Sequence, residues 1–417
     1  MNKHRPARDT ADQQTPSGHP VLMLVLATIG FALNFWAWAL LSPLAAHFTQ
    51  TLDLSSFEQS VLVAVPVLVG SLGRIPVGAL TDRYGGRILF PLISVVTVIP
   101  VLFLGFLGHS SLAALLIGGF FLGIGGTAFA IGVPFVNAWF PPGKRGFAIG
   151  IFGMGMGGTA IAALTTVNLM NRFNLQTPFI VTAVALGIYA VVAALLLRDA
   201  PGRPPQNEPL GRRLAETMRL SATWQASALY ALAFGGYVAF SVYLPSYLKN
   251  AYELSPSDAS NRMAGFVLLA VVMRPVGGWL SDKFGAVAVT AVSLAVVTAG
   301  AAVQSFTPDL MPVGTIAFLV MAGALGAGSG AVFALVSLLT PAGRVGSVTG
   351  FVGAAGGLGG FVPPLVMGGI YGALGSYALG LAALALVSLL LFVFTTTTVR
   401  KAVDKHARQE STAGAST

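Results

Sequence analysis

Long apolar segments alternate with short polar segments along almost the whole chain. A helix needs about 20 apolar residues to cross the hydrocarbon core of a bilayer, and twelve windows bounded by charged or turn-forming residues meet that requirement. The pattern therefore predicts an all-α integral membrane protein with twelve transmembrane helices. The predicted spans are residues 20–47, 57–81, 88–107, 111–139, 146–171, 176–197, 222–248, 257–281, 286–306, 312–339, 346–371 and 375–397.

The polar segments between the predicted spans are mostly short, but residues 198–221 form a long one after the sixth span. This segment is expected to be a linker between two six-helix halves, residues 20–197 and 222–397. Residues 1–19 and 398–417 are polar and lack a long apolar run, which is typical of disordered tails.

Composition excludes most other classes of protein. Of the 417 residues, 55% are hydrophobic and 9% are charged, whereas a soluble domain carries about 25% charged residues. The chain has no Cys, so disulfides, thiolate metal sites and a Cys nucleophile are excluded, and its five His are scattered. We therefore expect no metal site, no cofactor and no enzyme activity.

The distribution of the 23 Lys and Arg residues predicts the orientation of the chain in the membrane. With the N-terminus in the cytoplasm, 18 of them fall on the cytoplasmic side and 3 on the opposite side, which agrees with the positive-inside rule. Both termini are therefore expected to be cytoplasmic in a multi-pass protein of the cytoplasmic membrane. The same bias accounts for the net charge of +9, so nucleic acid is not expected as a partner.

A sequence repeat relates the two halves. The segment RIPVGALTDRYGG, which begins at Arg74, recurs as RPVGGWLSDKFGA from Arg274, 200 positions later. A glycine-rich stretch that follows Pro141 recurs at the same offset after Pro341. The repeat predicts two pseudo-symmetric halves of the same orientation, with the substrate site between them near the middle of the membrane.

The segment GALTDRYGGR, Gly78 to Arg87, resembles the signature loop of the major facilitator superfamily. Its glycines permit a tight reversal between two helices, and Asp82 can accept hydrogen bonds from a helix N-terminus. The resemblance implies the major facilitator fold and a conformational latch at this loop and at its repeat. The implied latch residues are Asp82, Arg83, Arg87, Asp282 and Lys283.

Two arginines lie deep inside predicted spans. Arg74 is eight positions, or about 12 Å, from the cytoplasmic end of its span, and Arg274 lies at the same depth. An Arg at such depth needs a cavity or an anion, and all 14 acidic residues lie in tails, loops or span ends. Each Arg alone is also compatible with bonds to backbone carbonyls or with a side chain that reaches the interface. The symmetric pair favours a site for an oxyanion, which a guanidinium group binds with two parallel hydrogen bonds.

The fifth and eleventh spans are rich in glycine. Gly153 and Gly157 share one helix face, as Gly353 and Gly357 do in the repeat. Such faces permit close helix packing, and their bare backbone also lets helices slide and lets a small ligand approach. Two other polar residues inside spans, Asn34 and Asn137, are expected to form hydrogen bonds between helices.

A narrower resemblance concerns the fourth and fifth spans. The segment GTAFAIGVPFVNAWFPPGKRGFAIGIFGMG, residues 126–155, is similar to the corresponding signature of the NarK-type nitrate/nitrite porters. The resemblance extends over essentially the whole membrane part and implies a site for nitrate and nitrite. One departure is Met156-Gly157, where that family often has Asn, so a direct amide contact to the anion is not expected. The expected substrate-binding residues are Arg74, Arg274, Phe129, Tyr230, Phe234, Gly153 and Gly353.

These observations predict a secondary active transporter of nitrate and nitrite that works by alternating access, as a monomer in the lipid bilayer. Exchange of nitrate for nitrite is favoured, because a proton symporter needs a titratable group in the spans and we find only His47. The alternatives are proton-coupled nitrate symport and a carrier of the same fold for another small anion, such as cyanate or a monocarboxylate. A transport-inactive sensor and a passive anion channel are further alternatives, although two coupled halves with a duplicated latch favour alternating access.

Overall fold

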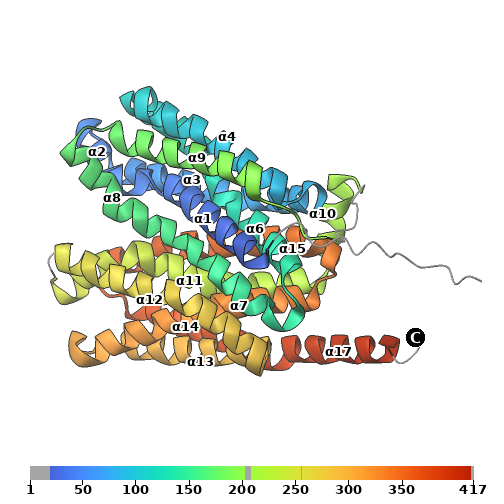
Figure 1. Cartoon of the computed structure of the whole chain (residues 1–417). Coiled ribbons are helices and arrows are strands. Elements are labelled where there is room, and N and C mark those ends of the chain that lie inside the picture. The colour runs from blue at the N-terminus through green and yellow to red at the C-terminus, as the bar shows by residue number, and fades with distance from the viewer. Residues whose placement is uncertain (1–18, 202–207, 255, 415–417) are drawn as a thin grey trace, which may run out of the picture.

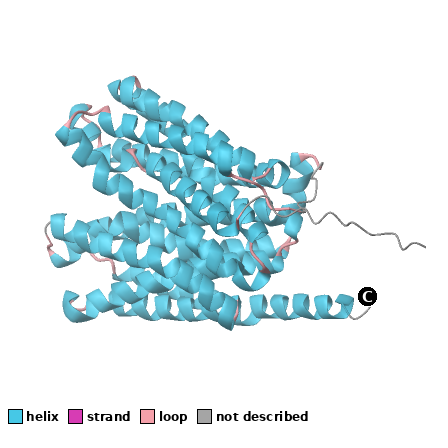
Figure 2. Cartoon of the chain, viewed as in Figure 1, coloured by secondary structure: helices cyan, strands magenta, loops and turns pink. Residues whose placement is uncertain are grey.

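The computed structural model describes residues 19–201, 208–254 and 256–414, and nearly all of these residues are helical (Figure 2). No strand occurs within these ranges. The first half contains α1 (Pro20–Trp38), α2 (Leu41–Thr51), α3 (Ser56–Tyr84), α4 (Gly86–Phe106), α5 (Leu112–Leu122), α6 (Ala128–Trp139), α7 (Pro142–Gly153), α8 (Gly158–Arg172) and α9 (Thr177–Leu196).

The second half follows a short helix in the linker, α10 (Leu210–Arg219). It contains α11 (Ser221–Tyr252), α12 (Pro256–Phe284), α13 (Ala286–Ser305), α14 (Thr315–Leu339), α15 (Val345–Leu374), α16 (Ala378–Phe394) and α17 (Arg400–Gly414). Short 3-10 segments, η2 (Gly123–Thr127) and η3 (Met154–Gly157), connect α5 to α6 and α7 to α8, so each pair forms one membrane span.

Eleven helical segments within the described ranges are long and apolar enough to cross a membrane. The remaining long helix, α11, has 32 residues, which corresponds to a length of about 48 Å. Large apolar side chains such as Ile99, Ile188 and Leu195 lie exposed, as expected for a surface that faces lipid. The structure therefore agrees with the twelve predicted spans.

The two halves lie side by side and meet along helices far apart in the sequence (Figure 1). Helix α3 of the first half packs on α15 of the second, and α7 packs on α12. Figure 1 shows α10 and α17 at the same end of the bundle. We call this end, formed by residues 82–87, 208–219, 282–286 and 341–347, the linker face, and the opposite end, which includes residues 41–55, the distal face.

The duplicated loop after α3 and after α12 has the backbone that its glycines predict. Gly85 and Gly285 separate these helices from α4 and α13 with φ angles of 86° and 89°. A residue with a Cβ is strained at such angles, whereas glycine adopts them readily. The same residue type at the same offset therefore gives both halves the same sharp reversal at the linker face.

The prediction of a disordered segment from Arg400 onward is wrong, because α17 continues through Gly414. This segment is rich in Ala, Lys, Arg, Glu and Gln, which are good helix formers. It also continues from α16 through a single π-helical segment, so no new helix nucleus is required. The prediction for residues 1–19 falls almost entirely outside the described residues.

Candidate anion-binding site

The two arginines inside the spans are buried in the centre of the molecule. Arg74 lies in α3 and Arg274 in α12, and each is only 2% exposed. Arg74 donates from Nε to the carbonyl of Gly126 at 2.9 Å and from Nη1 to the carbonyl of Gly353 at 2.8 Å. Neither side chain reaches the interface, and Arg74 binds backbone carbonyls from both halves of the protein.

Arg274 has a different set of partners. Its Nη2 donates to the hydroxyl of Tyr230 at 2.9 Å, and its Nη1 lies 2.6 Å from Sδ of Met156. Its Nε has no hydrogen-bond partner among the described residues. A thioether therefore contacts the guanidinium group of Arg274.

Two aromatic rings flank both guanidinium groups. The ring centroid of Phe129 lies 5.6 Å from Cζ of Arg74 and 5.8 Å from Cζ of Arg274. The corresponding distances to Phe234 are 5.8 Å and 5.5 Å. The ring of Tyr230 stacks on Phe129 and on Phe234, with interplanar angles of 8° and 2°. The ring faces partly offset the cost of burying two like charges.

The site has an uncompensated positive charge. Within the described residues, neither arginine forms an ion pair with a carboxylate, and each still has N–H groups without a protein partner. A buried charge without a counter-ion is costly. A small anion would supply both a negative charge and hydrogen-bond acceptors to such a site.

Two glycines at equivalent positions let the arginines lie against the backbone. A Cβ on Gly153 would lie 2.8 Å from Nε of Arg274, and one on Gly353 would lie 3.0 Å from Cδ of Arg74. Gly353 also accepts the hydrogen bond from Arg74 described above. Each half therefore presents a bare stretch of helix to the arginine of the other half.

Some contacts of the site were not predicted from the sequence. Phe333 of α14 packs edge-on against Phe129 and Tyr230, with centroid distances of 4.9 Å and 4.6 Å. Phe35 of α1 lies 5.8 Å from Cζ of Arg74. Each lies in an apolar helix that contains further aromatic residues, and no repeat distinguishes it from residues of the ordinary core.

The prediction of hydrogen bonds between helices is confirmed for one of the two asparagines. Nδ2 of Asn34 in α1 donates to Oγ of Ser94 in α4 at 2.9 Å. Oδ1 of Asn137 has no hydrogen-bond partner among the described residues.

A cavity of about 250 Å³ leads from the site toward the distal face. Helices α1, α2, α3 and α8 of the first half and α11 and α12 of the second half line it. It ends against Met156 and Phe234, which both contact Arg274. These two side chains thus contact both Arg274 and the cavity.

The linker face is closed by two contacts between the halves, which the sequence repeat relates. Asp82 accepts hydrogen bonds from the backbone N–H groups of Gly346 and Ser347, at 2.8 Å and 2.7 Å. Asp282 accepts from those of Gly146 and Phe147, at 3.0 Å and 2.8 Å. Each carboxylate lies near the N-terminus of a helix in the opposite half, where backbone N–H groups and the helix dipole favour a negative charge.

The three basic residues of the predicted latch have contacts within their own halves. Cζ of Arg83 lies 5.3 Å from the ring of the adjacent Tyr84, and Nζ of Lys283 lies 5.4 Å from the ring of Trp279. The backbone N–H of Arg87 donates to Asp199 of its own half at 3.2 Å. Among the described contacts, the two acidic residues bind the opposite half, whereas those of the three basic residues lie within their own half.

Glycine backbones touch across the closed linker face, which allows a direct test of closure. A Cβ on Gly278 would collide with the carbonyl of Gly146, whereas one on Gly143 would meet nothing within 4 Å. We expect Gly278→Ala to prevent full closure and Gly143→Ala to leave it unchanged. Spin labels on the exposed ends of α3 and α12, at Tyr84→Cys and Phe284→Cys, measure the separation. An unchanged distance in Gly278→Ala would contradict this prediction.

The fold and the site define a membrane transporter. Two related six-helix halves enclose a charged site at their boundary, one end of the boundary is closed, and a cavity approaches the site from the other end.

Comparisons with known proteins agree with this class. The model of the Major Facilitator Superfamily matches residues 27–255 and 226–416. The probable nitrate/nitrite transporter NarK2 of Mycobacterium tuberculosis is 46% identical over 92% of this chain and 98% of its own length. The nitrite extrusion protein of Bacillus subtilis is 34% identical over 89% of this chain and 93% of its own.

Among solved structures, the transporter FucP in the outward conformation is similar with a TM-score of 0.73 and 18% identity, over 90% of this chain and 98% of FucP. The human organic anion transporter MFSD10 has a TM-score of 0.75 at 15% identity, over 90% and 99% of the two chains. These two structures support the fold. The chain belongs to the major facilitator superfamily and, within it, to the family of NarK-type nitrate/nitrite porters. The predicted twelve-helix fold and the predicted family are therefore confirmed.

Proposed function

We propose that this protein carries nitrate and nitrite across the cytoplasmic membrane by alternating access. The observation that carries the proposal is the pair of buried arginines, Arg74 and Arg274, which share two aromatic rings and have no carboxylate partner among the described residues. Relatives that cover almost the whole chain are named as transporters of nitrate or nitrite. One chain supplies every residue of this site, so a monomer is a sufficient unit.

We assign a role to each residue of the site. Arg74 and Arg274 donate hydrogen bonds to the oxygens of one bound anion, while the rings of Phe129 and Phe234 hold its plane. Tyr230 orients Arg274 through its hydroxyl. The last two residues of the proposed site, Gly153 and Gly353, leave room for the arginine stems.

The structure fits one state of an alternating-access cycle. The bias of Lys and Arg supports an orientation with the linker face and both termini in the cytoplasm. With this orientation the closed linker face and the cavity toward the distal face correspond to an outward-facing carrier. Asp82 and Asp282 act as latches that hold this state, and rocking of the halves would open the cytoplasmic side.

Electrostatics favours exchange over net uptake. Two unit charges about 8 Å apart repel by about 2 kcal/mol at an effective dielectric constant of 20, before the cost of desolvation is added. A bound monoanion offsets much of this repulsion, so the loaded carrier should change state faster than the empty one. Obligatory exchange of nitrate for nitrite follows from that difference in rate.

Uptake into proteoliposomes distinguishes exchange from proton symport. We expect rapid nitrate uptake into liposomes preloaded with nitrite and little uptake into empty ones, with or without a pH gradient. Nitrate uptake into empty liposomes would establish symport instead, if a pH gradient drives this uptake and a protonophore abolishes it. Liposomes preloaded with cyanate or acetate test whether the site prefers another small anion.

A further inference from the structure

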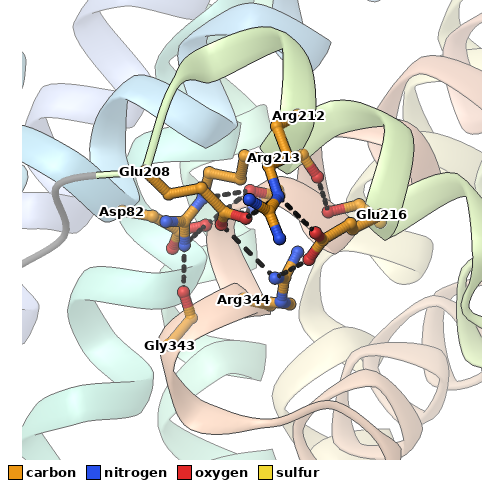
Figure 3. A network of polar contacts seen from close by, with 9 residues as sticks. Asp82, Glu208, Arg212, Arg213, Glu216, Gly343 and Arg344 are labelled. Atoms are coloured by element: carbon orange, nitrogen blue, oxygen red, sulfur yellow. Dashed lines mark hydrogen bonds and ion pairs between the residues drawn. The ribbon is translucent and has the colours of Figure 1, made fainter.

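Helix α10 in the linker lies over the closed linker face, next to the ends of α3 and α15 (Figure 3). One of its arginines, Arg213, is among the largest fully buried side chains of the protein, with 2% exposure. Its neighbour Arg212 is 72% exposed. A buried arginine in a polar linker requires specific partners.

Arg213 binds both halves of the protein at once. Its Nη2 lies 3.0 Å from Oδ2 of Asp82 in the first half. Its Nε donates to Oγ of Ser347 at 2.9 Å, and its Nη2 donates to the carbonyl of Gly343, both in the second half. The hydroxyl of Ser347 in turn donates to Asp82 at 2.7 Å. The carboxylate of Asp82 therefore receives a counter-charge in addition to its three hydrogen bonds from α15.

Further contacts attach α10 to the second half. Arg344, just before α15, pairs with Glu208 and Glu216. Within the helix, the hydroxyl of Thr217 donates to the carbonyl of Arg213 at 2.8 Å, and the hydroxyl of Thr223 in α11 donates to the carbonyl of Thr217 at 2.7 Å. Only Leu220 separates α10 from α11. Arg213 will therefore move with the second half when the halves separate, while Asp82 moves with the first.

The equivalent contact in the other half lacks this reinforcement. Asp282, related to Asp82 by the repeat, receives two backbone hydrogen bonds from α7. Ser347 corresponds to Phe147, which has no hydroxyl group. Within the described residues, Asp282 forms no ion pair with an arginine. The two contacts that close the linker face are therefore unequal, and Arg213 of the linker and the hydroxyl of Ser347 account for the difference.

We propose that Arg213 is a gating residue of the transport cycle, which holds the linker face closed by binding Asp82 across the boundary between the halves. In the closed state Asp82 is buried, so a carboxylate without a counter-ion is unfavourable there. In the open state water solvates Asp82, and the loss of Arg213 has little effect. Removal of the guanidinium group therefore shifts the equilibrium toward the open linker face. The inference rests on alternating access but not on the identity of the anion.

The test measures the opening of the linker face directly. Because the native chain has no Cys, the pair Tyr84→Cys and Phe284→Cys carries the only two spin labels, one on each half. In lipid nanodiscs without added anion, we expect a mostly closed population with native Arg213. In Arg213→Gln we expect the ratio of open to closed molecules to rise at least tenfold.

Matched variants keep the result specific to the buried arginine. Arg212→Gln removes the same group from the exposed side of α10 and is expected to leave the distance distribution unchanged. Arg213→Lys keeps the charge but loses the bonds to Ser347 and Gly343, and a smaller shift is expected. It also remains informative if Arg213→Gln fails to fold. Distance distributions in Arg213→Gln and Arg213→Lys equal to that of Arg212→Gln would overturn the proposal.

Nitrate exchange measured on the same proteins separates this inference from the proposed function. If the native protein carries no nitrate or nitrite while Arg213→Gln still opens the linker face, the substrate assignment fails and the gating role stands. If exchange is present but the opening does not change, the gating role fails. In a native protein that exchanges nitrate, we expect Arg213→Gln to slow exchange severalfold, because the carrier returns less often to its closed state.

Discussion

Arg74→Lys and Arg274→Lys are each expected to reduce nitrate transport at least tenfold while the protein still inserts and folds. Lysine keeps the positive charge but loses the planar set of donors that binds two oxygens at once. It also cannot keep the bonds that hold each arginine in place, such as those from Arg74 to Gly126 and Gly353. A hydrogen bond to a charged group contributes about 1.5–3 kcal/mol, and about 1.4 kcal/mol corresponds to a factor of ten.

The measurement is the initial rate of nitrate exchange in proteoliposomes, beside nitrate binding to the purified protein. Arg172→Lys, at an exposed position at the end of α8, is the matched control and should retain normal exchange. Monodisperse elution in detergent shows that a variant is folded. Near-normal exchange by either Arg74→Lys or Arg274→Lys would refute a site shared by the two arginines.

Asp82→Asn is expected to slow transport at least tenfold with little loss of nitrate binding. The substitution removes the charge opposite Arg213 and replaces one acceptor oxygen with an amide donor that faces the N–H groups of α15. Loss of one member of a buried ion pair costs about 3–5 kcal/mol, and this cost arises only while the linker face is closed. The variant should therefore accumulate with that face open.

The equivalent substitution Asp282→Asn provides the comparison. This substitution weakens only backbone hydrogen bonds to Asp282. The effect of Asp282→Asn on transport should therefore be smaller than that of Asp82→Asn. Nitrate binding in detergent and exchange in vesicles are measured together for both variants. Parallel loss of binding and transport in an Asp82→Asn variant that elutes as a monodisperse peak would place Asp82 in the substrate site and contradict a latch.

Much of the fold follows from local features of the sequence. Runs of apolar residues define the spans, because apolar side chains are favourable in hydrocarbon and a helix satisfies its own backbone hydrogen bonds there. The repeat at an offset of 200 predicts two related halves, and it also pairs Arg74 with Arg274 and Asp82 with Asp282. A charge at membrane depth is costly enough to mark a functional residue from the sequence alone. The segment after Arg400 is the clearest failure, since low hydropathy alone does not distinguish a polar helix from a disordered tail.

The partners of these residues were decided only by the tertiary structure. Arg74 binds a carbonyl 279 positions away, and Asp82 binds Ser347 across 265 positions. No local pattern encodes such pairs, because they depend on how α3 packs on α15 and how α7 packs on α12. The sequence by itself thus determined the spans and the two arginines at membrane depth, which depend on the free energy of one segment in its solvent. It also determined the pseudo-symmetry, which the repeat records directly. Three features emerged only from the packing of the two halves: the aromatic stack around Phe333, the thioether contact of Met156 and the burial of Arg213. Each requires surfaces that meet only after both halves have folded.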